Sequence, residues 1–152
     1  MGTIRYLKVL SLVICLGITS LAQGKLDHLN KWVGKYPTYN NTKPRQEFLR
    51  LPEIQRGLKT LLSKEDYRFV TKTCGKEVPI KKIDNYLIVR RCHSYACAYG
   101  GATIVINLDD GAMHIAIKNE GDKEQRWFST NNKQGELPFE VRLAFLIVKK
   151  RA

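Results

Sequence analysis

Residues 86–118 read YLIVRRCHSYACAYGGATIVINLDDGAMHIAIK, and this stretch decides the fold. Three runs in it, 86–91, 102–108 and 112–118, are short and rich in β-branched residues, which is typical of strands. The Asp109-Asp110-Gly111 turn before the third run indicates a hairpin, because glycine tolerates the positive φ that a tight turn requires. With a further run at 125–128, the sequence predicts an antiparallel sheet of about five strands.

The segments on either side of the sheet have helical spacing. Apolar residues at 26, 29, 32 and 33 precede a Gly-Lys-Tyr-Pro breaker and predict a short helix. Pro52 opens a second helix that ends near residue 62, and Ser63 caps a third that ends near Cys74. The amphipathic segment 139–149 is interpreted as a final helix, with a last strand as the alternative. The whole pattern predicts an α+β domain whose helices pack on one face of the sheet.

The N-terminus has the pattern of a secretory signal. Arg5 and Lys8 precede an apolar run over residues 9–22, which ends in the small residues Ser20 and Ala22. A run of 14 residues is shorter than the roughly 20 that span a bilayer. We therefore expect residues 1–22 to be a signal peptide and residues 23–152 to be a single exported domain, periplasmic or secreted.

The chain is strongly basic, with a formal net charge of +12. Loss of residues 1–22 removes two basic residues and leaves 24 basic against 14 acidic ones, a charge of +10. Such a field attracts anionic partners, for example an anionic envelope surface of lipid or polysaccharide. Export and the lack of a nucleic-acid-binding signature argue against nucleic acid as a partner.

No enzymatic motif stands out. The sequence lacks a P-loop, a dinucleotide-binding glycine pattern, a Gly-x-Ser-x-Gly elbow and a His-Glu-x-x-His pair, so we expect neither catalysis nor a cofactor. Cys92 and His93 are neighbours on a strand and point to opposite faces, which argues against a nucleophile–base pair. A zinc site built from Cys74, Cys92, His93 and Cys97 lacks the Cys-x2-Cys spacing, so no metal is expected.

The exported domain keeps three cysteines, Cys74, Cys92 and Cys97, which allow three single pairings. Loop closure favours the nearest pair, Cys92–Cys97, with Cys74 free or buried. We call the segment that this pair would close, residues 92–97, the 92–97 loop.

The 92–97 loop is the strongest candidate for a binding site. It carries His93, Ser94 and Tyr95, with Arg90 and Arg91 beside it on the preceding strand. Rigid loops that display aromatic and arginine side chains are enriched at interaction sites, because they lose little entropy on docking. The alternative is a bridged connector that has no partner.

At these residues the chain resembles the family of periplasmic inhibitors of vertebrate lysozyme (Ivy). The resemblance lies in Trp32-Val-Gly-Lys-Tyr-Pro37, in Leu51-Pro-Glu-Ile54, and in a strand that leads into Cys-x4-Cys and then Ile104-Val-Ile106. It implies an antiparallel sheet with helices on one side and a disulfide-closed loop, Cys92 to Cys97, that plugs the active cleft of a glycan-cleaving enzyme. The implied partner is a lysozyme or another peptidoglycan hydrolase.

The loop differs from the family pattern. Family loops place Pro-His-Asp or Pro-His-Asn before the second cysteine, whereas here Ser94, Tyr95 and Ala96 hold those places and the histidine is His93. Both His93 and Tyr95 are long enough to act as the plug, and we favour Tyr95 because it sits in the middle of the loop. Vertebrate lysozymes are cationic, so a domain of charge +10 would be repelled unless its positive charge lies away from the loop.

Two other functions fit the sequence. One is an immunity protein against a peptidoglycan-degrading toxin, built on the same scaffold. The other is a binder of anionic envelope lipid or polysaccharide that uses the charge of the domain in place of the loop. The sequence does not predict the oligomeric state.

Overall fold

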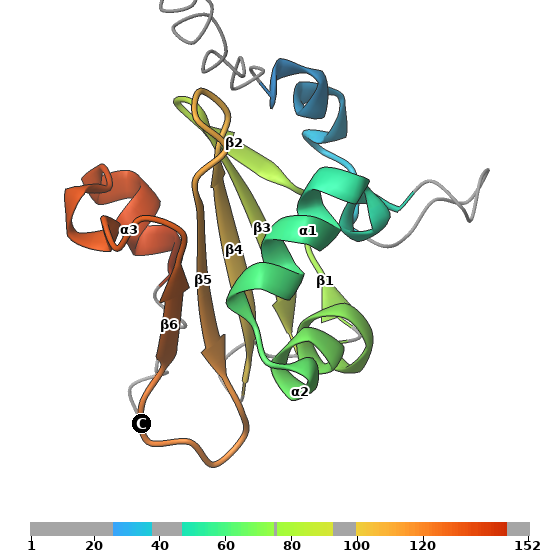
Figure 1. The fold of residues 1–152 in the computed structure, drawn as a ribbon, viewed down its shortest axis with the longest axis vertical. Coiled ribbons are helices and arrows are strands. Elements are labelled where there is room, and N and C mark those ends of the chain that lie inside the picture. Colours follow the sequence, from blue (N-terminus) through green and yellow to red (C-terminus); the bar gives the residue numbers. More distant parts are fainter. Residues whose placement is uncertain (1–25, 38–46, 75, 93–99, 146–152) are drawn as a thin grey trace, which may run out of the picture.

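The computed structural model describes residues 26–37, 47–74, 76–92 and 100–145. Its centre is an antiparallel sheet in the order β1-β3-β4-β5-β6, and β2 pairs with the other end of β3 (Figure 1). The strands are β1 Lys76–Glu77, β2 Lys81–Ile83, β3 Tyr86–Cys92, β4 Gly101–Asn107, β5 Met113–Lys118 and β6 Arg126–Ser129. The predicted α+β fold with an antiparallel sheet of about five strands is confirmed; the two short edge strands β1 and β2 were not predicted.

The predicted hairpin turn lies between β4 and β5. Gly111 has a φ of +73°, a conformation that favours glycine. The carboxylate of Asp110 accepts a hydrogen bond from the backbone N–H of Ala112 at 2.8 Å. Asp110 therefore has the local turn role that aspartate commonly has.

The helices lie before and after the sheet. Two 3₁₀ helices, Leu26–Trp32 and Phe48–Arg50, precede α1 Pro52–Leu61 and α2 Lys64–Arg68, which continues into a π-helical turn, Phe69–Thr73. The 3₁₀ turn Gln134–Glu136 and helix α3 Phe139–Phe145 follow the sheet. The hydroxyl of Ser63 accepts a hydrogen bond from the Asp66 N–H at 3.1 Å, so Ser63 caps α2 as its sequence pattern indicates.

The larger core lies between the N-terminal helices and one face of the sheet. Strand residues that point to this face alternate along β3, β4 and β5, as the pleat requires. They pack against the helix side chains Leu29, Phe48, Ile54, Leu58 and Val70.

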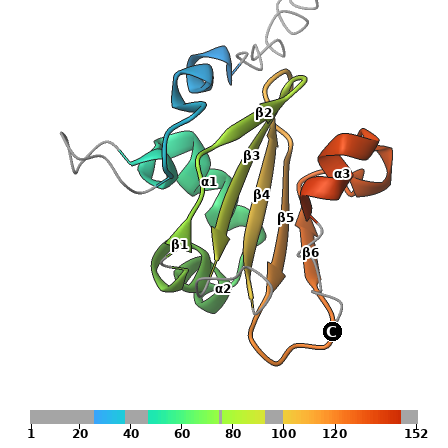
Figure 2. The same cartoon turned by 180° about the vertical axis from the view of Figure 1, so that it is seen from behind.

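Helix α3 covers the opposite face of the sheet (Figure 2). Its Val141 and Phe145 pack on Ile88, Val105 and Ala116, which are the alternate residues of β3, β4 and β5. The N-terminal helices pack on one face of the sheet, as expected, whereas α3 packs on the other face. The central strands are apolar on both faces, so both faces have to be buried by helices.

Candidate functional site

Strands β3 and β4 are tightly paired where the connection between them begins and ends, at Cys92, Gly100 and Gly101, and we call these three residues the base of the loop. Cys92, the last residue of β3, pairs in register with Gly101, the first residue of β4. A Cβ atom at Gly101 would overlap the carbonyl oxygen of Arg91, and one at Gly100 would lie 2.9 Å from the Lys118 carbonyl oxygen. Both positions therefore require glycine, because the backbones approach too closely for any side chain.

Arg91, which precedes Cys92 on β3, is buried, with 4% of its surface exposed. Its Nε lies 2.9 Å from Oε1 of Glu77 on β1, and its guanidinium donates to the carbonyl of Val70 in the π-helical turn. Sequence reasoning placed Arg91 among the partner-contacting residues. In the structure its side chain ties β3 to two neighbouring elements inside the domain.

Both cysteines among the described residues are buried. Cys74 is a free thiol with none of its surface exposed, and burial raises its pKa to about 11. Cys92 has 2% of its surface exposed. Because Cys74 is a free thiol, it is not bonded to Cys92.

Arg90 lies on the face of β3 that α3 covers, together with Ile88. Its side chain is half-buried, and burial lowers the pKa of its guanidinium. The remaining candidate residues, His93, Ser94, Tyr95 and Cys97, lie outside the described residues.

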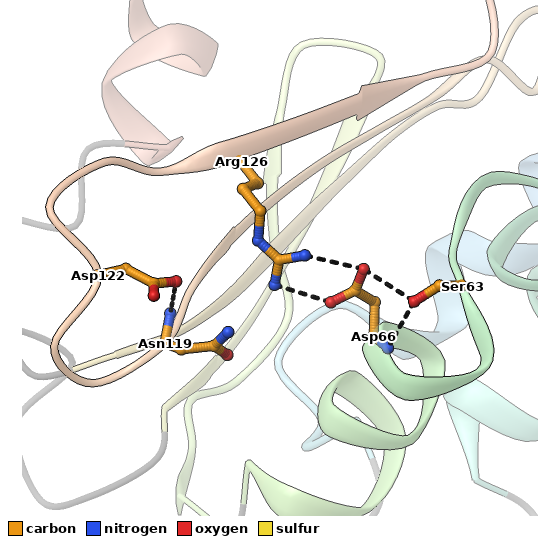
Figure 3. A network of polar contacts seen from close by, with 5 residues as sticks. All are labelled: Ser63, Asp66, Asn119, Asp122 and Arg126. Atoms are coloured by element: carbon orange, nitrogen blue, oxygen red, sulfur yellow. Dashed lines mark hydrogen bonds and ion pairs between the residues drawn. The ribbon is translucent and has the colours of Figure 1, made fainter.

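A polar pocket of about 710 Å³ adjoins the base of the loop on the α2 side. One wall is built by an ion pair that joins α2 to β6: the guanidinium of Arg126 donates to the two carboxylate oxygens of Asp66 at 2.7 and 3.0 Å (Figure 3). The hydroxyl of Ser63 donates to the same carboxylate at 3.0 Å. The hydrogen bonds to the Asp66 side chain raise the pKa of Arg126.

The pocket is less basic than the domain as a whole. Four carboxylate residues and three cationic residues line it: Glu65, Asp66, Asp122 and Glu124, and Arg68, Lys123 and Arg126. Asn119, also in its lining, belongs to the turn on which Gly100 packs. The pocket lining itself therefore carries no excess of positive charge.

Period-2 alternation in β3 could have indicated the burial of Arg91, because Arg91 shares a face with Leu87 and Val89. The contacts of Arg91 with Glu77 and Val70 could not be predicted from a local sequence pattern, because only the tertiary fold brings these residues together. The Asp66–Arg126 bridge joins residues 60 positions apart and was missed for the same reason.

Within the described ranges, no three histidine, cysteine or carboxylate side chains gather closely enough to hold a metal ion. The helices described there also lack the length and apolar composition that a membrane span requires.

An antiparallel sheet with helices on both faces defines a small α+β domain. Residues 53–150 match the family model described as "Inhibitor of vertebrate lysozyme (Ivy)". The match covers more than half of the chain, so the chain belongs to this family of lysozyme inhibitors. No curated protein and no solved structure is significantly similar to it.

Proposed function

We propose that residues 23–152 are an exported, non-enzymatic inhibitor that inserts the 92–97 loop into the active cleft of a lysozyme or a related peptidoglycan hydrolase. Membership of the Ivy family carries this proposal, because it supplies the class of activity and a protein partner. The signal-like residues 1–22 supply the route of export.

The described base of the loop supports a preorganised binding element. Cys92 is buried and is paired in register with Gly101, and Arg91 anchors the strand from below. A segment that leaves from such a base loses less conformational entropy on binding than a free loop does. We propose that Cys97 is the disulfide partner of Cys92 and that Cys74 stays reduced in the core.

Tyr95 is the proposed plug. Among the loop side chains, Tyr95 and His93 are long enough to enter a cleft, and Tyr95 lies away from both anchoring cysteines. Arg90 is the proposed charged neighbour, because glycan-cleaving enzymes keep carboxylates in their clefts. Arg91 has no place in this contact, since its guanidinium is bound to Glu77 and Val70 inside the domain.

The polar pocket removes part of the electrostatic objection to a cationic target. Its four carboxylate residues exceed its three cationic ones, although the exported domain has an excess of basic residues. A cationic enzyme approaching the loop from this side meets a weaker positive field than the net charge implies.

The test is inhibition of vertebrate lysozyme on a peptidoglycan substrate. The parent protein is expected to inhibit, and Tyr95→Ala is expected to weaken inhibition by about tenfold or more, on the order of 1.4 kcal/mol. Tyr36→Ala is the matched control, because Tyr36 is an exposed tyrosine, 44% accessible, outside the loop. Equal inhibition by both variants would show that the loop is a connector.

Intact mass of the exported protein tests the covalent part of the proposal. The expected product begins at Gln23, carries one disulfide within the 92–97 loop, and alkylates at Cys74 only after unfolding. A peptide map that joins Cys74 to either other cysteine would remove the proposed loop.

Salt distinguishes this function from the binding of a polyanion through net charge. A loop seated in a cleft is expected to lose little affinity between low and physiological salt, because its contacts are short-range. A steep loss would favour the anionic envelope surface as the partner.

A further inference from the structure

A groove of about 510 Å³ lies on the α3 side of the sheet, between helix α3 and strands β2 and β3. Most of its lining is apolar. Its apolar residues are Val78, Pro79, Ile83, Ile88, Leu143 and Ala144, and its charged residues are Lys81, Arg90 and Glu140.

The groove follows from the pleat of the two strands. Lys81 and Ile83 are two residues apart on β2, and Ile88 and Arg90 are two residues apart on β3, so all four side chains point to the face that α3 covers. Within the described residues, helix α3 covers this face with Val141 and Phe145. The groove lies on the sheet surface beside these two side chains.

Apolar surface remains in contact with solvent along this edge of α3. Leu143, which lines the groove, is 46% exposed, and Phe139 on the same helix is 61% exposed. Adjacent exposed apolar side chains beside an apolar groove favour an apolar ligand, because covering them removes them from water.

The charges select the kind of ligand. Two cations, Lys81 and Arg90, line the groove against one carboxylate, Glu140. Arg90 is half-buried, where an opposite charge interacts with it more strongly than it would in open water. An apolar floor beside two cations is complementary to an apolar chain with an anionic head. The volume lies within the range of about 300 to 1,000 Å³ that is usual for small-molecule sites.

We infer that this groove binds one molecule of a single-chain anionic amphiphile, with its chain against Ile83, Ile88 and Leu143 and its carboxylate or phosphate head near Lys81 and Arg90. The site goes beyond the proposed inhibitor function and shares with it only Arg90, which lies outside the 92–97 loop. The Tyr95→Ala test of inhibition and the Lys81→Glu test of this groove can therefore fail separately.

Calorimetry with dodecanoate below its micelle concentration tests the ligand class. The expected result is binding of one molecule per chain. Dodecyl maltoside and dodecyltrimethylammonium, which have the same chain with a neutral or a cationic head, are expected to bind at least about tenfold more weakly.

Two charge reversals on one strand locate the site. Lys81→Glu is expected to weaken dodecanoate binding by about fivefold or more through like-charge repulsion. Lys82→Glu makes the same charge change at an exposed residue outside the groove, and it is expected to change the affinity less than about twofold. Leu143 is 46% exposed, and Leu143→Gln removes an apolar side chain from the groove lining. It is therefore expected to weaken binding of the anionic and neutral probes alike.

Four outcomes of the experiments with the full exported protein would overturn the inference. They are equal affinity for the three head groups, equal effects of Lys81→Glu and Lys82→Glu, binding to anionic vesicles without binding to monomeric dodecanoate, and a dimer that Leu143→Gln converts to monomer. Binding that begins only when residues 146–152 are removed would also overturn it, because that segment would then be the occupant.

Discussion

Arg91 and Glu77 form a buried ion pair next to the last residue of β3. Their side chains are 5% and 7% exposed, and the Arg91 guanidinium also binds the Val70 carbonyl. The pair therefore holds edge strand β1 and the π-helical turn against the strand that carries Cys92. A buried charge without a counter-charge destabilises the folded protein far more than an unpaired charge at the surface does.

Glu77→Gln is expected to lower the free energy of unfolding by about 3 kcal/mol, because it leaves the Arg91 charge buried without its counter-charge. The measurement is urea denaturation at neutral pH. Glu47→Gln breaks the surface pair between Glu47 and Arg50, with 62% of the Arg50 side chain exposed, and is expected to lower it by less than about 1 kcal/mol. Equal losses in the two variants would contradict the structural role of Arg91.

His114 is a buried residue of β5, and its Nδ1 lies 2.9 Å from the Ser129 hydroxyl oxygen. Burial lowers the pKa of His114 below its ordinary value of 6.5, while the charge of Asp110 opposes this shift. The unfolded chain then binds a proton more readily than the folded chain does. This part of the stability is complete above about pH 6.5 and declines as the pH falls below it.

The free energy of unfolding, measured by urea titration at several pH values, is therefore expected to fall between about pH 6.5 and 5 in the parent. His114→Gln is expected to flatten this decline. A parent whose stability rises as the pH falls through this interval would contradict the account.

Strands β3 and β4 are the element that presents the loop, and their pairing depends on Gly101. Gly101→Ala is expected to lower the free energy of unfolding by about 1 to 3 kcal/mol, because its Cβ would overlap the Arg91 carbonyl oxygen. Gly135→Ala is the control, since a Cβ at Gly135 has no atom within 4 Å. Thermal unfolding of the two variants measures the difference. A Gly101→Ala variant as stable as Gly135→Ala would show that the base tolerates a side chain.

The elements that local pattern determines were predictable from sequence. Strands β3 to β6 have β-branched runs between turn signals, and Ser63 and Pro52 mark the helix starts, so these bounds agree closely with the structure. Strands β1 and β2 were missed because they have two and three residues and form only by pairing with β3. Helix α3 packs on Ile88, Val105 and Ala116 on the second face of the sheet. The strand pattern shows that these residues are apolar, but it does not show which element packs on them.

The candidate site was predictable only in part, because contacts distant in sequence complete it. The Cys-x4-Cys spacing pointed to the 92–97 loop, and the family match agrees with the class of function. The burial of Arg91 by Glu77 and Val70, and the bridge from Asp66 to Arg126, depend on tertiary packing that no local motif encodes.

At the scale of the whole molecule, the two faces of the sheet have separate proposed tasks. The N-terminal helices pack on one face to form the main core, and α2 borders the polar pocket near the loop base. Helix α3 packs on the other face beside an apolar groove. The central claim concerns the loop: it occupies the same cleft that binds glycan in the target enzyme.

Competition between the inhibitor and a chitin oligosaccharide for vertebrate lysozyme tests this claim most directly. The apparent affinity of the exported protein for lysozyme is measured at increasing concentrations of the oligosaccharide, which occupies the glycan cleft. The account predicts that the apparent dissociation constant rises in proportion to the oligosaccharide concentration, because the two ligands exclude each other. An affinity that does not change with the cleft filled would contradict insertion of the 92–97 loop into the active site.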